Sequence, residues 1–322
     1  MTTAPATSAT TSSGPNRTHL GIACGMGAGA LWGLVFLAPE LVRSFTPLQL
    51  AIGRYLAYGV IAVLLIAPRW RSVVGAVRPA EWLSLLWLSL AGNTLYYVLL
   101  SMAIQQGGIA TTSLVIGFLP VAVTIIGSRD TGAVPLRRLM PSLLLCGCGA
   151  LCIGAQALGG VSAAGGARLT GLLCAIGALV SWTAYAVGNS RCLARLDHIS
   201  AHDWSLLTGM VTGAQALLLI PVSLLFEPLR HSAGEWWRLG AVSVGVAVIA
   251  SIMGNALWNR MSRLLPLTLV GQMILFETLF ALLYGFMWEH RLPTMLESAA
   301  FLLVVLSVTS CIAAHRGRGA HA

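Results

Sequence analysis

Two apolar stretches of the chain carry polar and aromatic residues at the same helical spacing. The residues at i, i+4, i+7 and i+8 of the first stretch are Ser89, Asn93, Tyr96 and Tyr97. Those of the second stretch are Ser251, Asn255, Trp258 and Asn259. This spacing places each set on one face of a helix. Amides and rings of this kind bind the polar and flat parts of a small molecule without reacting with it, so the chemistry they indicate is recognition.

A third face combines Trp182, Tyr185 and Asn189, and Trp32 supplies a partner near the start of the chain. Polar groups in hydrocarbon need partners, so we expect these faces to point into a helix bundle and line a cavity. A structural alternative stays open, in which the asparagines join helices and the aromatic rings fill the core.

Two charged residues lie inside apolar sequence. Glu277 is in the middle of the run 265–287, with Met273 one turn earlier on the same stripe, and Arg54 follows Pro47 by seven residues. A charge at the centre of a bilayer costs about 2.5 to 3.5 kcal/mol on insertion scales, so each needs a reason. Glu277 is a candidate proton carrier or partner of a substrate ammonium, or a buried helix clamp. Arg54 could hold a carboxylate, pair with an acid or reach the interface.

The composition indicates the elements that position these residues. The chain has 322 residues, of which 57% are hydrophobic and 9% charged, with a mean hydropathy of +0.83. These values exclude a soluble domain and predict an all-α integral membrane protein in contact with the lipid bilayer. The net charge of +9 comes from arginines in the short connections between apolar runs, with no lysine, so we expect no nucleic-acid partner.

A spanning helix needs about 20 apolar residues, and ten windows meet this length. They are 20–39, 47–67, 80–104, 108–127, 137–157, 168–188, 203–226, 236–258, 265–287 and 293–313. With the N-terminus inside, thirteen arginines fall in or beside inner connections and five beside outer ones. The positive-inside rule therefore predicts that both termini are cytoplasmic.

The matched stretches indicate a duplication, because 89–128 and 251–288 share their small and polar positions in the same order. Five spans per copy is an odd number, so the second copy enters the membrane from the opposite side. We expect ten transmembrane helices as two inverted five-helix repeats, the arrangement of many secondary transporters. The expected division is a disordered tail 1–18, a repeat 19–157, a linker 158–167, a repeat 168–313 and a tail 314–322.

Nothing in the sequence indicates an enzyme, a cofactor or a metal. Three of the seven cysteines, Cys146, Cys148 and Cys152, share one helix without a nearby histidine or carboxylate, so we interpret them as packing residues. The sequence has no HExxH, nucleotide-binding loop or nucleophile elbow. We therefore expect no catalytic residues and no use of ATP within this chain.

Several segments resemble the drug/metabolite transporter superfamily in its EamA-type branch. They are Gly29-Ala-Leu-Trp32-Gly33, Gly53-Arg54-Tyr55, Ser101-Met-Ala103, Leu119-Pro120 and Glu277-Thr278. The family has Glu followed by Pro in each half, whereas this chain keeps only Pro120 in one half and Glu277 in the other. This departure argues against a symmetric kink with paired acids.

Within the superfamily, the aromatic faces look most like those of aromatic amino-acid exporters. The resemblance implies alternating-access export of aromatic and other neutral amino acids across a bacterial inner membrane, with protons as a candidate coupling ion. The expected substrate-binding residues are Trp32, Arg54, Asn93, Tyr96, Tyr97, Trp182, Tyr185, Asn189, Asn255, Trp258, Met273 and Glu277. Two alternatives remain: an exporter of hydrophobic cations or another metabolite, and a non-transporting membrane scaffold or receptor.

Overall fold

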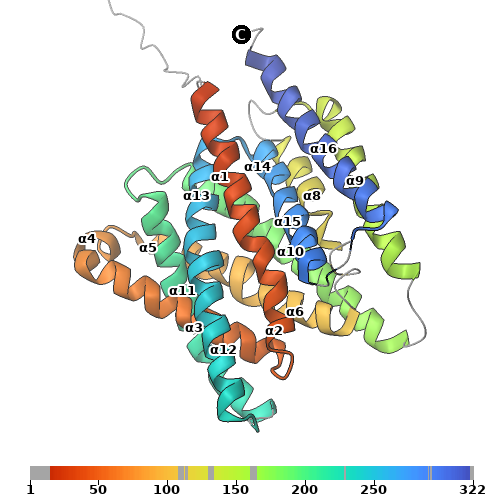
Figure 1. Ribbon diagram of the computed structural model, residues 1–322. Helices are drawn as coiled ribbons and strands as arrows, with labels where there is room; N and C mark the ends of the chain where they lie inside the picture. The colour runs from red at the N-terminus through yellow and green to blue at the C-terminus, as the bar shows by residue number, and fades with distance from the viewer. Residues whose placement is uncertain are drawn as a thin grey trace, which may run out of the picture.

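The protein is a bundle of helices (Figure 1). The computed structural model describes residues 15–107, 112, 115–129, 134–159, 165–227, 230–288, 290 and 292–319, and every regular element within them is helical. The elements of the first half are α1 (Pro15–Gly33), η1 (Leu34–Leu37), α2 (Ala38–Leu41), α3 (Pro47–Ile66), η2 (Ala67–Arg69), α4 (Trp70–Val74), α5 (Pro79–Ser89), η3 (Leu90–Thr94), α6 (Leu95–Gly107), α8 (Leu119–Gly127) and α9 (Leu136–Gly159). Those of the second half are α10 (Gly165–Leu193), α11 (Ala201–Phe226), α12 (Ala233–Val246), η4 (Ala247–Gly254), α13 (Asn255–Leu264), α14 (Leu267–Met273), α15 (Leu275–Trp288) and α16 (Met295–Gly319).

Seven helical runs in the described residues are long and apolar enough to cross a bilayer. They are Arg17–Leu41, Pro47–Val74, Pro79–Gln106, Leu169–Leu193, Ala201–Phe226, Ala233–Leu264 and Leu267–Trp288. Helices α9 and α16 occupy the expected fifth and tenth windows, and α8 occupies the second part of the fourth. The remainder of the fourth window lies largely outside the described residues. The chain is therefore a multi-pass helical membrane protein.

The packing of the helices shows how the two halves are related. The corresponding helices α3 and α11, and α9 and α16, pack against each other, and the fourth spanning helices of the two halves pack through α8 and α14. The first helix of each half instead packs against the third of the other, α1 on η4 and α13, and α10 on α6. A two-fold axis between the halves produces this pattern. In Figure 1, α1 and α10 run in opposite directions, and so do α9 and α16, so the repeats are inverted.

The helices α3 and α11 touch through their backbones. A Cβ atom built on Gly59 would lie 2.7 Å from Cα of Gly213, and one built on Gly213 would lie 2.6 Å from Cα of Gly59. Beside this contact, the Tyr58 hydroxyl donates a 2.6 Å hydrogen bond to the Ser205 carbonyl. Small residues allow membrane helices to approach this closely.

Each half contains a π-helical turn in its third spanning helix, η3 in one and η4 in the other. These turns coincide with the duplicated stretches, and first-helix side chains of the opposite half bind their carbonyls. Ser181 Oγ on α10 donates to the Ala91 carbonyl at 2.7 Å. Trp32 Nε1 on α1 donates to the Ala250 carbonyl at 3.0 Å. The wide turns thus expose carbonyl groups that hold the two halves together.

The fourth and ninth spanning helices are both interrupted. A turn at residues 117–118 precedes α8, and a turn at Ile274 separates α14 from α15. At the matched points the ladder tightens to i→i−3 bonds, from Phe118 N–H to the Val115 carbonyl at 3.1 Å and from Glu277 N–H to the Ile274 carbonyl at 3.0 Å. A tightened turn interrupts a helix without a proline, so both halves are interrupted although Thr278 stands where the first half has Pro120. Only the second interruption carries an acid.

Several helices are longer than the expected domain boundaries. Helix α1 begins at Pro15, α9 extends to Gly159, α10 begins at Gly165 and α16 extends to Gly319. Proline favours the first position of a helix, and a helix continues beyond the residues that cross the hydrocarbon. The described parts of the expected tails and linker are therefore helical. Residues 1–14, 160–164 and 320–322 lie outside the described residues.

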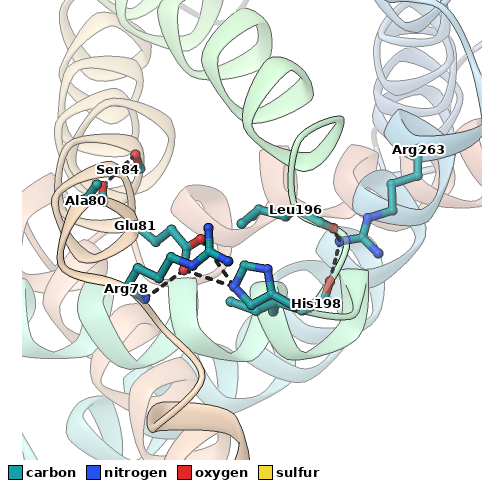
Figure 2. Close-up of polar contacts among 8 residues, drawn as sticks. Arg78, Ala80, Glu81, Ser84, Leu196, His198 and Arg263 are labelled. Atoms are coloured by element: carbon teal, nitrogen blue, oxygen red, sulfur yellow. Dashed lines mark hydrogen bonds and ion pairs between the residues drawn. The ribbon is translucent and has the colours of Figure 1, made fainter.

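Polar contacts close one end of the bundle around the loop between α10 and α11. Figure 2 shows Arg263 of α13 beside this loop, where its Nη2 donates to the Leu196 carbonyl at 3.0 Å and also to the Ile199 carbonyl. On the other side, His198 Nε2 lies 3.3 Å from the Glu81 carboxylate, which accepts the Arg78 N–H at 2.8 Å. Arg263 thus joins α13 to the loop, and Glu81 joins α5 to the same loop through His198.

A second ion pair, between Arg69 and Asp203 at 2.9 Å, closes the same end. The start of α1 also lies there, because Gly21 contacts Leu265. Three of the arginines assigned to one membrane side by the positive-inside rule therefore gather at one end: Arg69, Arg78 and Arg263.

We expect Arg263→Ala to increase amide hydrogen exchange of residues 194–200 by at least about tenfold. The change removes charge-assisted hydrogen bonds to two loop carbonyls, each worth about 1.5 to 3 kcal/mol. Exchange followed by mass spectrometry in detergent measures the effect. The exposed neighbour Arg260 makes no hydrogen bond to the described residues, so Arg260→Ala is the matched control. Equal exchange in both variants would contradict the assignment.

Candidate functional site

A small cavity lies at the centre of the bundle between the two halves, with a free volume of about 30 Å³. Its lining residues are Trp32, Val35, Arg54, Tyr55, Gly92, Asn93, Tyr96, Leu100, Trp182, Tyr185, Asn255 and Glu277. One buried water needs about 10 to 15 Å³ by this measure, so the cavity holds about two or three waters. This volume is far below the roughly 300 to 1,000 Å³ of small-molecule pockets, so the lining residues pack largely against each other.

Eight of the twelve predicted residues line this cavity. They are Trp32, Arg54, Asn93, Tyr96, Trp182, Tyr185, Asn255 and Glu277. The fold thus brings these side chains together from α1, α3, α6, α10, α13, α15 and the η3 turn. The two asparagines also join helices, because Asn93 Nδ2 donates to Thr212 Oγ1 at 3.4 Å and Asn255 Nδ2 to the Tyr58 hydroxyl at 3.3 Å.

The other four predicted residues do not line the cavity. Asn189 joins helices instead: its Nδ2 donates to Asn259 Oδ1 at 2.8 Å, and its Oδ1 accepts from Trp204 Nε1 at 2.9 Å. Met273 lies against Gly25 of α1, since the break at Ile274 takes it off the stripe of Glu277. The remaining two, Tyr97 and Trp258, are buried against lining residues. For Asn189 the structural alternative describes the side chain better.

Four lining residues were missing from the predicted set: Val35, Tyr55, Gly92 and Leu100. Gly92 could have been found, because the duplicated stretches match it with Gly254. A Cβ on Gly92 would lie 2.3 Å from the Tyr185 ring, and one on Gly254 would lie 2.6 Å from Trp32 Nε1. At both positions an aromatic ring from the opposite half lies where a larger residue would place its Cβ atom, so each position needs a glycine. Val35 and Leu100 carry no signal that separates them from other apolar residues.

The aromatic residues form one connected cluster around Trp182. Its ring centroid lies 5.2 Å from that of Trp258, 5.8 Å from Tyr185, 6.0 Å from Trp32 and 6.2 Å from Tyr96. Trp32 also lies 5.1 Å from Trp258. These distances are within the range of favourable ring contacts. The rings meet mostly edge to face, so the cluster gives one wall of the cavity an aromatic surface contributed by both halves.

Two tryptophans in this cluster differ in their N–H groups. Trp32 Nε1 donates to the Ala250 carbonyl, whereas Trp258 Nε1 is buried without a partner among the described residues. Trp32→Phe removes a buried hydrogen bond, worth about 0.5 to 1.5 kcal/mol, whereas Trp258→Phe removes a donor without a partner among the described residues. We expect the first variant to have the lower midpoint of thermal unfolding in detergent. The same midpoint for both would show that the Trp32 bond adds no stability.

Arg54 is a buried cation at the cavity wall. Its Nε donates to Ser251 Oγ of η4 at 3.2 Å. Its Cζ lies 4.5 Å from the centroid of the Tyr97 ring and 5.1 Å from that of Tyr55. Cation–π contacts stabilise a guanidinium without neutralising it. The side chain is thus held in place while its charge stays available to the cavity.

Glu277 is the acidic side chain of the cavity. It lies in the first turn of α15, where the positive end of the helix dipole favours a carboxylate. No hydrogen bond or ion pair from the described residues reaches its carboxylate, and Arg54 acts on it only through space. The cavity therefore contains one basic and one acidic side chain that do not form an ion pair.

A larger pocket of about 790 Å³ lies between α15 and α16. Its lining is apolar except for His290 and Ser298, and it shares no residue with the central cavity. It lacks convergent charged groups, so size alone does not make it the functional site. Within the described residues, no group of His, Cys, Asp and Glu could hold a metal ion.

An inverted-repeat bundle with a polar and aromatic cavity between its halves is the architecture of a secondary membrane transporter. A model of the EamA-like transporter family matches the chain twice, over residues 19–155 and 169–312. The chain therefore belongs to the EamA-like transporter family, within the drug/metabolite transporter superfamily, and is a membrane transporter of that family.

Two further comparisons give a relative in sequence and a similar fold. Inner membrane protein YtfF of Escherichia coli (strain K12) is 31% identical over 310 residues, which cover 89% of this chain and 93% of that protein. A solved structure titled only as the crystal structure of a protein has a TM-score of 0.70 and 20% sequence identity. It covers 91% of this chain and 98% of its own, and this likeness shows the fold alone.

Proposed function

We propose that this transporter exports amino acids across a bacterial inner membrane, with a preference for those with aromatic and other neutral side chains. The observation that carries the proposal is the central cavity, which combines an aromatic wall with one buried guanidinium and one buried carboxyl group. The aromatic wall suits an apolar side chain, because rings offer contact area without one fixed shape. The polar groups suit the common part of an amino acid.

We assign the substrate site to the eight predicted residues that line the cavity together with Tyr55, which adjoins Arg54 on α3. Two of the other predicted residues, Tyr97 and Trp258, support this site by packing against Arg54 and Trp182. Residues 19–157 and 168–313 are proposed as the two repeats.

Both termini are proposed to be cytoplasmic. In Figure 1 the start of α1 and the end of α16 lie at the same end of the bundle. The start of α1 contacts Leu265, which follows Arg263, so this is the end closed by Arg69, Arg78 and Arg263. The printed name of the relative YtfF supports an inner-membrane location.

Alternating access is proposed as the mechanism, and the two halves differ in a way that supports it. Helix α1 ends at Gly33 and is followed by the 3₁₀ turn η1, whereas its counterpart α10 continues unbroken to Leu193. In inverted-repeat transporters one half moves against the other around the site. Exchange of these two conformations between the halves would move the opening of the cavity from one side to the other. Protons remain the candidate coupling ion, with Glu277 as the carrier.

Hydrophobic cations are the rival substrates. A cation site needs a carboxylate among aromatic rings, and Glu277 beside Tyr96 fits this description. Arg54 opposes it, because an unpaired guanidinium in the same cavity repels a second cation. A non-transporting scaffold leaves the matched polar faces without a role.

The proposal predicts efflux of labelled phenylalanine, tyrosine and tryptophan from proteoliposomes that contain the purified protein. A panel of hydrophobic cations and amino acids, measured with and without a pH gradient, separates the substrate classes and tests proton coupling. Empty liposomes supply the control for leak. Efflux of cations alone would overturn the amino-acid assignment, and no efflux of any compound would favour the scaffold.

A further inference from the structure

The two charges in the central cavity are held apart by the contacts of Arg54. Its Nε bond to Ser251 and its position over the Tyr97 ring fix the guanidinium against α6 and η4. Glu277 approaches from α15 without a hydrogen-bond partner among the described residues. Two opposite charges in a low-dielectric site attract each other strongly, so separation requires that one of them be held.

The cavity is also balanced in charge. Among the described residues that line it, Arg54 and Glu277 are the only ionisable ones apart from tyrosines. A bound cation would satisfy the carboxylate but leave the guanidinium unpaired, and a bound anion would do the reverse. A buried charge without a partner is strongly destabilising. Only a ligand with one charge of each sign satisfies both groups at once.

We propose that Arg54 and Glu277 form a bipolar site, in which Arg54 binds the carboxylate and Glu277 the ammonium of one zwitterion. This inference rests on the proposed amino-acid export and deepens it, because it assigns a pole of the substrate to each residue. The guanidinium matches a carboxylate with parallel N–H groups. The aromatic cluster around Trp182 then faces the substrate side chain.

The site recognises the pairing of charges on one ligand more than either charge alone. Three ligands with the same phenyl group separate these possibilities: phenylalanine is a zwitterion, phenethylamine a cation and 3-phenylpropionate an anion. Binding to the purified full-length protein is followed by tryptophan fluorescence, and by the ligand-induced shift in unfolding midpoint. Equilibrium binding avoids the leak of the two analogues through liposomes.

The wild-type protein is expected to bind phenylalanine at least about tenfold more tightly than either analogue, which corresponds to one lost charge contact. Glu277→Gln should weaken phenylalanine at least about tenfold and make 3-phenylpropionate the preferred ligand. Arg54→Gln should weaken phenylalanine similarly and make phenethylamine the preferred ligand. Glu40→Gln, which changes a carboxylate paired with Arg43 near the end of α2, should leave all three affinities unchanged.

Ser251→Ala keeps both charged residues, so it tests the site even if the charge variants do not fold. It removes the Nε bond that holds Arg54, so Arg54 can move toward Glu277 and form an ion pair. We expect phenylalanine affinity to fall severalfold, with neither analogue becoming preferred.

Two kinds of failure can be separated. If wild type binds phenylalanine but Glu277→Gln binds it equally well, or both charge variants keep the wild-type order of ligands, the bipolar site is overturned and amino-acid export stands. If wild type binds phenethylamine more tightly than phenylalanine and exports no amino acid, the proposed function fails as well.

Discussion

Gly59→Val is expected to prevent stable packing of α3 against α11 and to abolish transport. A Cβ atom at this position would lie 2.7 Å from Cα of Gly213, and this neighbour is backbone, which no rotamer change can move. Overpacking of this kind costs about 1 to 3 kcal/mol or more. The affected helix also carries Arg54 and Tyr55, so a displaced α3 takes two cavity residues with it.

The yield of folded protein and the unfolding midpoint in detergent measure the effect. Gly240→Val on α12 is the matched control, because a Cβ there meets nothing within 4 Å. It introduces the same β-branched residue into a helix and therefore carries the same propensity cost. A Gly59 variant as stable as the Gly240 variant would show that α3 and α11 do not meet as described.

The second large effect is expected from Trp182→Ala, which should weaken binding of aromatic amino acids by about 30-fold to 140-fold. Trp182 contacts four other rings, so its loss removes the centre of the aromatic wall. Ring contacts and burial of apolar area together give about 2 to 3 kcal/mol for such a surface, and each 1.4 kcal/mol is a factor of ten. Affinity for alanine should change much less.

Dissociation constants for phenylalanine and alanine, measured on the same preparation, test this difference. Trp182→Phe should give an intermediate loss, since it keeps a ring, and Trp237→Ala is the control because that side chain is 81% exposed. An equal loss for phenylalanine and alanine would indicate a folding defect. Unchanged phenylalanine affinity would remove Trp182 from the site.

Hydropathy and residue spacing were sufficient to predict the helical membrane fold and part of the cavity lining. Spanning helices can be predicted from sequence because a helix that crosses lipid needs about 20 apolar residues in a row. The window 47–67 agrees with α3 to within one residue. The face spacing placed Asn93, Tyr96 and Asn255 at the same cavity, because the duplicated stretches lie on opposite sides of one axis.

Other features depend on contacts between distant segments and have no local signal. The π-turns η3 and η4 shift the helix register inside the duplicated stretches, and the break at Ile274 rotates Met273 away from Glu277. Asn189 has the same spacing as a cavity residue but finds Asn259 and Trp204 as partners. Helical periodicity identifies a face, whereas the neighbour of that face is decided by the fold.

The contact between Gly59 and Gly213 has a mechanical consequence. The backbones of α3 and α11 touch there, so this crossing would act as a pivot if the two halves tilted against each other. Such a tilt would have to change the contact of the Tyr58 ring with Gly209 and its hydrogen bond to the Ser205 carbonyl, and it would separate Arg69 from Asp203.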